Sequence, residues 1–432
     1  MRGNHSLFCW RIIALTMLLM ILPVHAETLE EAWREALAGN HRLKAAQENT
    51  AAAVQQLKAV KASRFPGLSL EAGYTALENE PAAKASLGLT PAPLQFPVGE
   101  KNSLSYQGTV TLPIYTSGRI RSGIDAAAAS VEAYRANEKS NTQDLKLQIA
   151  EAYVGILRAA RGLEVASSHA NSLEVHTRDA RNMFRKGMAA RNDLLAAQVA
   201  LANARQQMSQ AQSAVDLARA AYNYQLGRPL DQVVSLENIP PGRFVESLAT
   251  LTARAIQQRS ELMVIAGQIT ALHRQADGIR AEARPQVALS GGYAYQQNRY
   301  QVHEGQWMLT LGMQWNIFDS GIVRHKSSAV ERQAIGMQEQ RDDLISAISL
   351  QVRSAWLEMQ ESGKRLEVTN AAIEQANENL KVTKDRYING LSRNADVLDA
   401  EALRTLSLNN HANAHYDLVL AGLRLKRAVG DL

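Results

Sequence analysis

The segment Ile114-Tyr115-Thr116-Ser117-Gly118 recurs 203 residues later as Ile317-Phe318-Asp319-Ser320-Gly321. Further pairs keep this spacing: Gly187 with Gly390, Asp193 with Asp396, and Leu226 with Val429. Before the segment the spacing is 219 residues, as in the pairs Pro66 with Pro285, Gly73 with Gly292, and Tyr74 with Tyr293. So many matches in the same order predict that one structural unit occurs twice. The first copy then holds about 16 extra residues between Tyr74 and Tyr115, in a proline-rich stretch that we expect to be an exposed loop.

Apolar residues occupy every second position in two stretches of each copy. These stretches are Leu68 to Tyr74, Leu104 to Ile114, Val287 to Tyr295 and Trp307 to Ile317. A period of two residues is typical of β-strands. We expect strands over about 66–78, 103–115, 285–300 and 305–318. Strands of about ten residues are long enough to cross a bilayer at a tilt, but a soluble hairpin packed on a helix would show the same alternation.

Aromatic residues gather near the ends of the expected strands. They are Tyr74, Tyr115, Tyr293, Tyr295, Trp307, Trp315 and Phe318. Strands that cross a membrane carry girdles of aromatic side chains at both interfaces. These seven residues are therefore candidates for an aromatic belt in a membrane.

Proline is absent between Pro113 and Pro229 and again after Pro285, and proline is strongly excluded from helix interiors. Within both intervals apolar residues, many of them alanine, recur at alternating steps of three and four, which is typical of long helices packed side by side. One glycine in each interval, Gly187 or Gly390, is placed to end a helix. Each interval is thus expected to form a helical hairpin. We expect helices over 28–63, 119–184, 191–226, 248–282, 323–386 and 393–429, with a linker over 228–247.

The expected lengths suggest how these elements combine. A helix of about 66 residues is about 100 Å long, and the two shorter helices of each copy are together about as long. The sequence therefore predicts a rod of long helices joined to a few strands. Four strands cannot close a barrel, and lipid does not tolerate open sheet edges. Several chains would have to share one barrel, and three chains would give 12 strands.

Residues 1–26 have the parts of a secretory signal. A positively charged start precedes an apolar run from Ile12 to Leu22, and Val24-His25-Ala26 fits a small-residue cleavage site. The run of about 11 residues is shorter than the roughly 20 needed to span a bilayer, so we expect cleavage after Ala26 rather than an uncleaved anchor. The single cysteine, Cys9, lies in the removed part. The exported chain would therefore hold no disulfide.

Charge and motifs argue against other classes of protein. The net charge of +5 is small and dispersed, so no nucleic-acid binding is expected. The chain has no glycine-rich phosphate loop, no His-Glu-x-x-His and no second cysteine, so we expect no enzyme and no cofactor. His411 and His415 have a spacing that could grip a metal. No cysteine, carboxylate or third histidine adjoins them in the sequence, and we expect a polar helix face and no metal.

With these features assembled, the chain resembles the TolC family of outer membrane efflux channels, the outer membrane factors. Besides the duplicated plan, the resemblance rests on the openings Leu29 to Asn40 and Leu248 to Ala255, on the strand entries Arg64-Phe65-Pro66 and Ala283-Arg284-Pro285, and above all on Tyr387-Ile388-Asn389-Gly390 with Asp396-Val397-Leu398-Asp399-Ala400. It implies a mainly α fold with a membrane β part. The expected assembly is a homotrimer sharing a 12-stranded β-barrel, four strands per chain, continued by a long periplasmic α-helical barrel.

The resemblance also implies a place and a function. The protein would lie in the outer membrane of a Gram-negative bacterium, with a large periplasmic part, and would passively conduct substrates outward in a tripartite efflux or type I secretion system. Its partners would be outer membrane lipid, a periplasmic adaptor (membrane fusion) protein and an inner-membrane transporter. The alternative is a periplasmic coiled-coil adaptor or structural protein without a pore. That alternative accounts for the hairpins and the signal but leaves the two matching strand pairs unexplained.

By position, the resemblance assigns roles to residues near the two helix turns. Asp396 and Asp399 would form acidic rings at the periplasmic entrance, where three copies of each carboxylate favour cations. Tyr387 matches the family's gating tyrosine, and Asp193 its acidic partner, with Asn192 beside it. Acidic residues also favour a helix N-terminus, and this simpler role for Asp396 and Asp399 is compatible with the ring.

One position departs from the family pattern. The arginine that the family carries two residues after the turn glycine is Ser392 in this chain, and the adjacent Arg393 could replace it. The resemblance further implies that the turns dock onto the adaptor. The residues of this docking tip are Gly187, Met188, Gly390 and Leu391.

Overall fold

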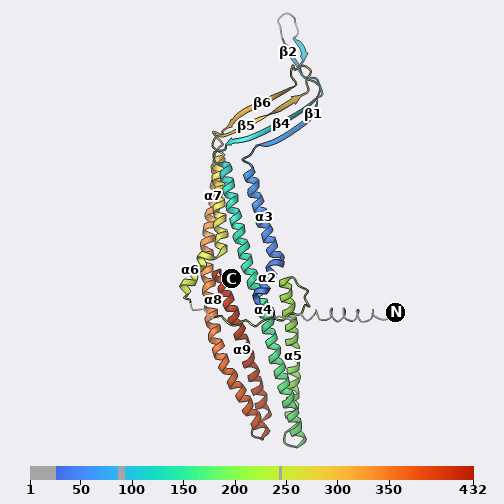
Figure 1. The fold of residues 1–432 in the computed structure, drawn as a ribbon, viewed down its shortest axis with the longest axis vertical. Helices are drawn as coiled ribbons and strands as arrows, with labels where there is room; N and C mark the ends of the chain where they lie inside the picture. Colours follow the sequence, from blue (N-terminus) through green and yellow to red (C-terminus); the bar gives the residue numbers. More distant parts are fainter. Residues whose placement is uncertain (1–25, 86–92, 243–245) are drawn as a thin grey trace, which may run out of the picture. The chain divides into compact units, whose positions relative to one another are not determined.

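The computed structural model describes residues 26–85, 93–242 and 246–432. The expected signal therefore lies, except for Ala26, outside the described residues. The elements, in chain order and labelled in Figure 1, are α2 Leu29–Gly39, α3 His41–Ala62, β1 Gly67–Ala76, β2 Ala82–Ala85, β3 Leu94–Pro97, β4 Asn102–Tyr115, α4 Arg119–Arg185, α5 Arg191–Leu226, α6 Leu248–Gln258, α7 Ser260–Ala281, β5 Gln286–Gln296, β6 Gly305–Gln314, α8 Ile322–Ile388 and α9 Asn394–Val429.

The chain forms two compact units. The helical unit comprises residues up to Ala45, Ser140–Arg259 and Ser346–Leu432. The strand unit comprises Ala46–Lys139 and Ser260–Ile345. Each unit therefore takes equivalent segments from both copies of the sequence repeat, and the duplication does not correspond to two separate domains.

The strand unit holds a four-stranded antiparallel sheet in the order β1-β4-β5-β6 (Figure 1). Residues paired directly across adjacent strands have their side chains on the same face of the sheet. The register therefore arranges the residues in rows across the four strands, and successive rows lie on opposite faces. One row consists of Leu70, Gly108, Tyr293 and Trp307, and the next consists of Glu71, Gln107, Ala294 and Gln306. The sheet thus has one largely apolar face and one largely polar face. The apolar side chains are not buried: Leu70 is 77% exposed and Trp307 is 82% exposed.

Three of the strands end earlier than the sequence predicts. β1 ends at Ala76 rather than at 78, β5 at Gln296 rather than at 300, and β6 at Gln314 rather than at 318. After β5 the chain turns because Glu304 accepts a hydrogen bond of 2.8 Å from the backbone N–H of Asn298. After β6 it turns because Asp319 accepts hydrogen bonds from the N–H groups of Gly321 and Val323, which start α8. Apolar alternation alone does not reveal these local caps.

The first-copy insertion, expected to be a loop, contains a short antiparallel hairpin of β2 and β3. The residues between these strands, 86–92, lie outside the described residues. The loop of the second copy holds the base of this hairpin. Asn298 donates to the carbonyl of Val98 at 3.0 Å, and Tyr300 donates to the Glu80 carboxylate at 3.0 Å. Arg299 adds a salt bridge of 3.1 Å to Glu100.

The first helix predicted for each repeat is interrupted by one extended residue. The predicted helix over 28–63 is α2 and α3, separated at Asn40 (φ −68°, ψ 123°), and that over 248–282 is α6 and α7, separated at Arg259 (φ −62°, ψ 118°). The Asn40 side chain accepts hydrogen bonds from the N–H groups of Arg42 and Leu43 and so starts α3. Arg259 is buried and donates to the carbonyl of Ala428 at 3.1 Å.

Small residues allow close helix contacts in the strand unit, as the abundance of alanine suggested. A Cβ atom added at Gly267 of α7 would lie 2.9 Å from the Cβ atom of Ala133 and 3.0 Å from the carbonyl oxygen of Ala129, both on α4. Real Cβ atoms do not approach so closely. The α4–α7 contact therefore requires glycine at this position.

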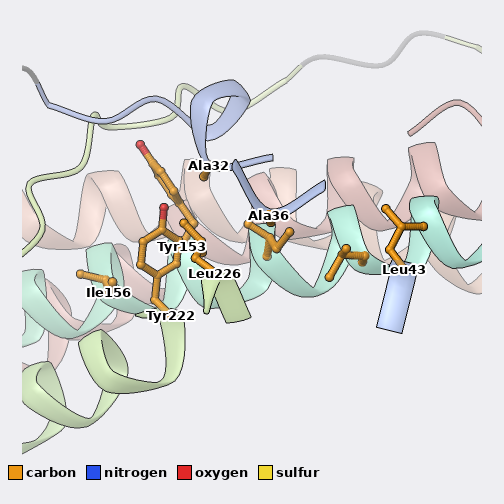
Figure 2. Close-up of a cluster of buried hydrophobic side chains, with 9 residues drawn as sticks. Ala32, Ala36, Leu43, Tyr153, Ile156, Tyr222 and Leu226 are labelled. Atoms are coloured by element: carbon orange, nitrogen blue, oxygen red, sulfur yellow. The ribbon is translucent and has the colours of Figure 1, made fainter. Parts of the chain in front are cut away.

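One core cluster of the helical unit lies between α2, the start of α3, α4 and α5 (Figure 2). Its buried members are Ala32, Ala36, Leu43, Leu145, Ile149, Tyr153, Ile156, Tyr222 and Leu226. The Tyr153 hydroxyl donates to the carbonyls of Glu27 and Glu237, at 2.6 and 2.7 Å. Burial raises the pKa of Tyr153 to about 12. The tyrosine therefore stays neutral and ties the N-terminal segment to the linker.

An arginine completes this anchor. Arg228, in the linker, donates to both carboxylate oxygens of Glu27 at 2.9 Å and also pairs with Glu35 of α2. The backbone of Glu27 bonds to that of Ser235 and Glu237 in a short parallel bridge. The linker expected over 228–247 thus contacts the start of the first repeat.

Candidate functional site

The turns between α4 and α5 and between α8 and α9 have the same geometry. Gly187 and Gly390 both have φ of 74°, a left-handed conformation that glycine adopts without strain. The next residue donates its N–H back into the preceding helix: Met188 to Met183 at 2.9 Å, and Leu391 to Arg386 at 2.8 Å. Met188 is 64% exposed and Leu391 68% exposed. Figure 1 shows both hairpins turning at the same end of the helical unit. Each turn therefore presents an exposed apolar side chain directly after its glycine.

A buried asparagine connects the two hairpins. Asn394, the first residue of α9, donates from its amide to the backbone carbonyl of Asp193 in α5 at 3.2 Å. Its amide oxygen lies 2.7 Å from Nε2 of His176 in α4. Burial lowers the pKa of His176, so the neutral ring with its proton on Nε2 donates to this oxygen. The structure thus brings Asp193 to the start of α9 through its backbone.

Tyr387 lies beside this connection, at the end of α8. It is 6% exposed, and its ring lies 5.2 Å from that of His176. Its hydroxyl is buried and meets no hydrogen-bond partner among the described residues. Burial, together with the negative charges of Asp193 and Asp179, raises the pKa of Tyr387. Tyr387 and Asp193 therefore interact through charge and burial, without a hydrogen bond between them.

Asp396 lies in the first turn of helix α9. Its carboxylate accepts hydrogen bonds of 2.9 Å from the backbone N–H of Arg393 and from the hydroxyl of Ser392. The Arg393 guanidinium lies 3.4 Å from the same carboxylate. These groups, the backbone N–H of Arg393 above all, lower the pKa of Asp396. The carboxylate is ionised and caps the helix.

The remaining residues assigned to the gate are exposed. Asp399 lies on the first turns of α9, and Asn192 at the start of α5. The Arg393 side chain is 86% exposed and contacts Asp396 of its own turn rather than the first hairpin. Ser392, at the position that departs from the family pattern, also binds Asp396. The structure therefore gathers Ser392, Arg393 and Asp396 at one helix start.

An ion pair between α8 and α9, whose carboxylate is fully buried, was not predicted from the sequence. The Glu401 carboxylate on α9 is fully buried and lies 2.5 Å from the ammonium of Lys384 on α8. Lys384 also donates to the hydroxyl of Ser172 on α4 at 2.7 Å, and Ser172 donates to Glu401. The sequence did hold one indication of this pair. Glu401 follows Val397 by one helical turn, so it falls on the same, packed side of α9. A charged residue on the packed side of a helix is a sign of a buried partner.

The aromatic candidates separate into two groups along the sheet. Tyr74, Tyr293, Tyr295 and Trp307 lie toward the ends of their strands that are joined to the β5–β6 loop and the insertion, whereas Tyr115, Trp315 and Phe318 lie at the helix ends. Contrary to the predicted strand bounds, Trp315 and Phe318 follow β6. Tyr106, which was not among the candidates, stacks on Tyr295 with a centroid distance of 4.8 Å.

His411 and His415 lie on a cavity of about 860 Å³ in the helical unit. A carboxylate, Glu367, lines the same cavity, which the sequence did not indicate. Nδ1 of His411 and Nε2 of His415 are buried without a hydrogen-bond partner in the described part of the chain. Burial lowers the pKa of both histidines. Among residues 26–85, 93–242 and 246–432, no three histidine, cysteine, aspartate or glutamate side chains lie close enough together to hold a metal ion.

In the same described ranges, no helix combines the length and the apolar composition needed to cross a membrane.

Comparison with known proteins places these features in context. Residues 32–227 and 251–431 match the model of a family described as outer membrane efflux protein. Alkaline protease secretion protein AprF of Pseudomonas aeruginosa is 25% identical over 352 residues, which cover 76% of this chain and 70% of AprF. Outer membrane protein TolC of Vibrio cholerae is 22% identical over 425 residues, which cover 95% of this chain and 92% of TolC.

A solved structure shares the fold. The outer membrane protein VceC of Vibrio cholerae aligns with a TM-score of 0.78 at 18% identity, covering 93% of this chain and 96% of VceC. The two matched ranges of the family model leave out 228–250, which includes the linker between the repeats.

Proposed function

Because the chain belongs to the outer membrane efflux protein family, we propose that it is the passive outer membrane conduit of a tripartite efflux or type I secretion system. It is a transport protein of the Gram-negative outer membrane, with a mainly α-helical fold and a membrane β part. In the proposal, an inner-membrane transporter and a periplasmic adaptor deliver substrates to it. The family is one of efflux proteins, so the alternative of an adaptor without a pore is set aside. The observation that carries the proposal is a sheet with an exposed apolar face in the same chain as two helical hairpins with matching turns.

The sheet supports a homotrimer with a shared barrel. Within the described residues, β1 and β6 are each paired on one side only. Unpaired backbone groups at such edges are costly in lipid. Pairing β6 of one copy with β1 of the next satisfies them, and three copies supply 12 strands. The exposed apolar face would then meet lipid, and the polar face would line the conduit.

The turns support docking of the adaptor. Met188 and Leu391 are exposed on turns of equal geometry, so that a trimer would present six similar apolar tips. Apolar side chains exposed at fixed positions are typical of protein interaction sites. We assign Gly187, Met188, Gly390 and Leu391 to this docking tip.

The start of α9 and its neighbours support a gate. In a trimer, Asp396 and Asp399 would each be present three times around one axis, where their charges favour cations. The connection from Asp193 through Asn394 to His176 would hold the α8–α9 hairpin against the α4–α5 hairpin. We assign Tyr387, Asp193, Asn192 and Arg393 to the groups around this gate.

Fractionation and reconstitution test the proposal together. The full chain, expressed with its signal, is expected in the outer membrane fraction and, after purification in mild detergent, to produce conductance steps in a planar lipid bilayer. Cross-linking of the purified protein should give a trimer. Recovery as a soluble periplasmic protein, or as a monomer without conductance, would contradict the conduit.

A further inference from the structure

One charged side chain lies in the four-stranded sheet. Glu71 is the only aspartate, glutamate, lysine, arginine or histidine among the residues of β1, β4, β5 and β6. Its equivalent in the second repeat, 219 residues later, is Ser290. A charged residue within a membrane-spanning segment is costly and usually functional. The repeated plan therefore does not by itself call for a charge at this position, since the second copy has serine there.

The register places Glu71 on the polar face of the sheet. Its direct partner on β4 is Gln107, and the row continues through Ala294 on β5 to Gln306 on β6. The positions on either side of Glu71 in β1, Leu70 and Ala72, belong to the apolar face. If the apolar face meets lipid, Glu71 and its two glutamines face the water of the conduit.

The same row lines a cavity in the strand unit. Glu71, Gln107 and Gln306 are among the residues that surround a space of about 770 Å³, which the β5–β6 loop borders with Gln301 and His303. The other carboxylate at this cavity, Glu304, is already bound by the Tyr295 hydroxyl at 3.0 Å and by the N–H of Asn298. Glu71, by contrast, is exposed and makes no hydrogen bond or ion pair with the described residues. Its charge is therefore available to a passing solute.

We propose that Glu71 sets the charge preference of the membrane part of this conduit, which it biases toward cations. This inference rests on the proposed function. Amide groups such as those of Gln107 and Gln306 offer both donors and acceptors and have no preference for either sign of charge. Three copies of Glu71 around one lumen add negative charge halfway along the strands, and low-dielectric walls concentrate its field. The substrate class that this part of the conduit favours is positively charged.

Ion selectivity of the reconstituted full chain tests the proposal. The reversal potential under a KCl gradient gives the permeability ratio of K⁺ to Cl⁻. We expect Glu71→Gln, which keeps the size and the hydrogen-bonding capacity, to lower this ratio by about two- to fivefold, the order of effect of a few unit charges acting through several ångströms of water. Glu71→Lys should shift the preference further toward anions. The effect should be larger at 0.1 M than at 1 M salt, because the screening length shortens.

The matched control is Glu78→Gln, which removes an exposed carboxylate just beyond the end of β1 and should leave the ratio unchanged. Each variant is also measured with Asp396→Ala and Asp399→Ala, so that carboxylates at the helix turns do not mask the effect. A conducting channel with the same ratio in both backgrounds after Glu71→Gln would overturn the inference alone. A chain that inserts without conductance would instead overturn the proposed function.

Discussion

The ammonium of Lys384 lies 2.5 Å from the carboxylate of Glu401, which is fully buried between α8, α9 and α4. Ser172 of α4 binds both groups, so the pair links the two helical hairpins as well as the two helices of one hairpin. A buried ion pair is weak evidence for stability in itself, but the loss of one partner leaves an uncompensated charge. This asymmetry gives a clear prediction.

Lys384→Met should destabilise the helical unit by about 3 kcal/mol, because the Glu401 carboxylate stays buried without its cation. Thermal unfolding of the purified protein, followed by far-ultraviolet circular dichroism, measures the effect. The double variant Lys384→Met with Glu401→Leu removes both charges and should recover most of the loss. A double variant as unstable as the single one would contradict the explanation by an unpaired charge.

The pairing of Glu35 with Arg228 predicts a pH dependence of stability. The hydrogen bond from Arg228 lowers the pKa of Glu35 below its ordinary value of 4.5. A carboxylate with a depressed pKa in the folded state contributes stability that is present above pH 4.5 and lost as the pH falls through the folded-state value. The unfolding midpoint of the native chain should therefore fall more steeply below pH 4.5 than that of Glu35→Gln. Glu30→Gln, on the exposed side of α2, is the control and should keep the native slope.

The two acidic residues of the proposed gate differ in their structural role, because only Asp396 caps the start of α9. Asp399 takes no part in the cap, so Asp399→Asn tests the acidic ring without disturbing the helix start. We expect it to weaken the block of planar-bilayer conductance by multivalent cations, and Asp396→Ala with Asp399→Ala to weaken it further. Asp396→Ala alone should also lower the stability of the folded chain, because the start of α9 loses its cap. Unchanged block in the double variant would exclude the acidic ring.

The connection made by Asn394 predicts a change in gating. Asn394→Ala leaves His176 without its partner and releases the Asp193 backbone, so the hairpins should separate more readily and the channel should dwell longer in states of high conductance. The buried groups left unpaired should cost about 1–3 kcal/mol. Single-channel recording measures the dwell times. Asn389→Ala, in the exposed turn nearby, should leave them as in the native chain, and equal dwell times in both variants would rule out the connection as a restraint.

The sequence predicted the family and a mainly helical fold with a four-stranded β part per chain, and both are confirmed. The helices were predictable because the absence of proline over long segments, and the glycine that ends a helix in each copy, can be read from neighbouring residues alone. The interruptions at Asn40 and Arg259 could not be predicted in the same way. A single extended residue leaves the apolar period almost unchanged on both sides, and the Arg259 side chain is held by groups far away in the chain.

The site was predictable to a smaller extent. The exposed turn residues and the cap at Asp396 depend on neighbours in sequence. By contrast, the Glu401 environment brings together Ser172 and Glu401, which are 229 positions apart, and which side chains meet there depends on the register of three helices. The charge preference inferred for Glu71 likewise depends on strand pairing. A single sequence reveals the period of a strand but not the residue that lies opposite.

The parallel bridge between Glu27 and the linker has a consequence for how the protein matures. A chain is synthesised from its N-terminus, yet the backbone of Glu27 is satisfied only when Ser235 and Glu237 have emerged. These hydrogen bonds therefore cannot form until the whole first repeat and the first part of the linker have been synthesised. The base of the β2–β3 hairpin can be fixed only later in synthesis, because its partners Asn298 and Tyr300 belong to the second repeat. During synthesis, the contacts of the N-terminal segment thus become possible before those at the base of the insertion.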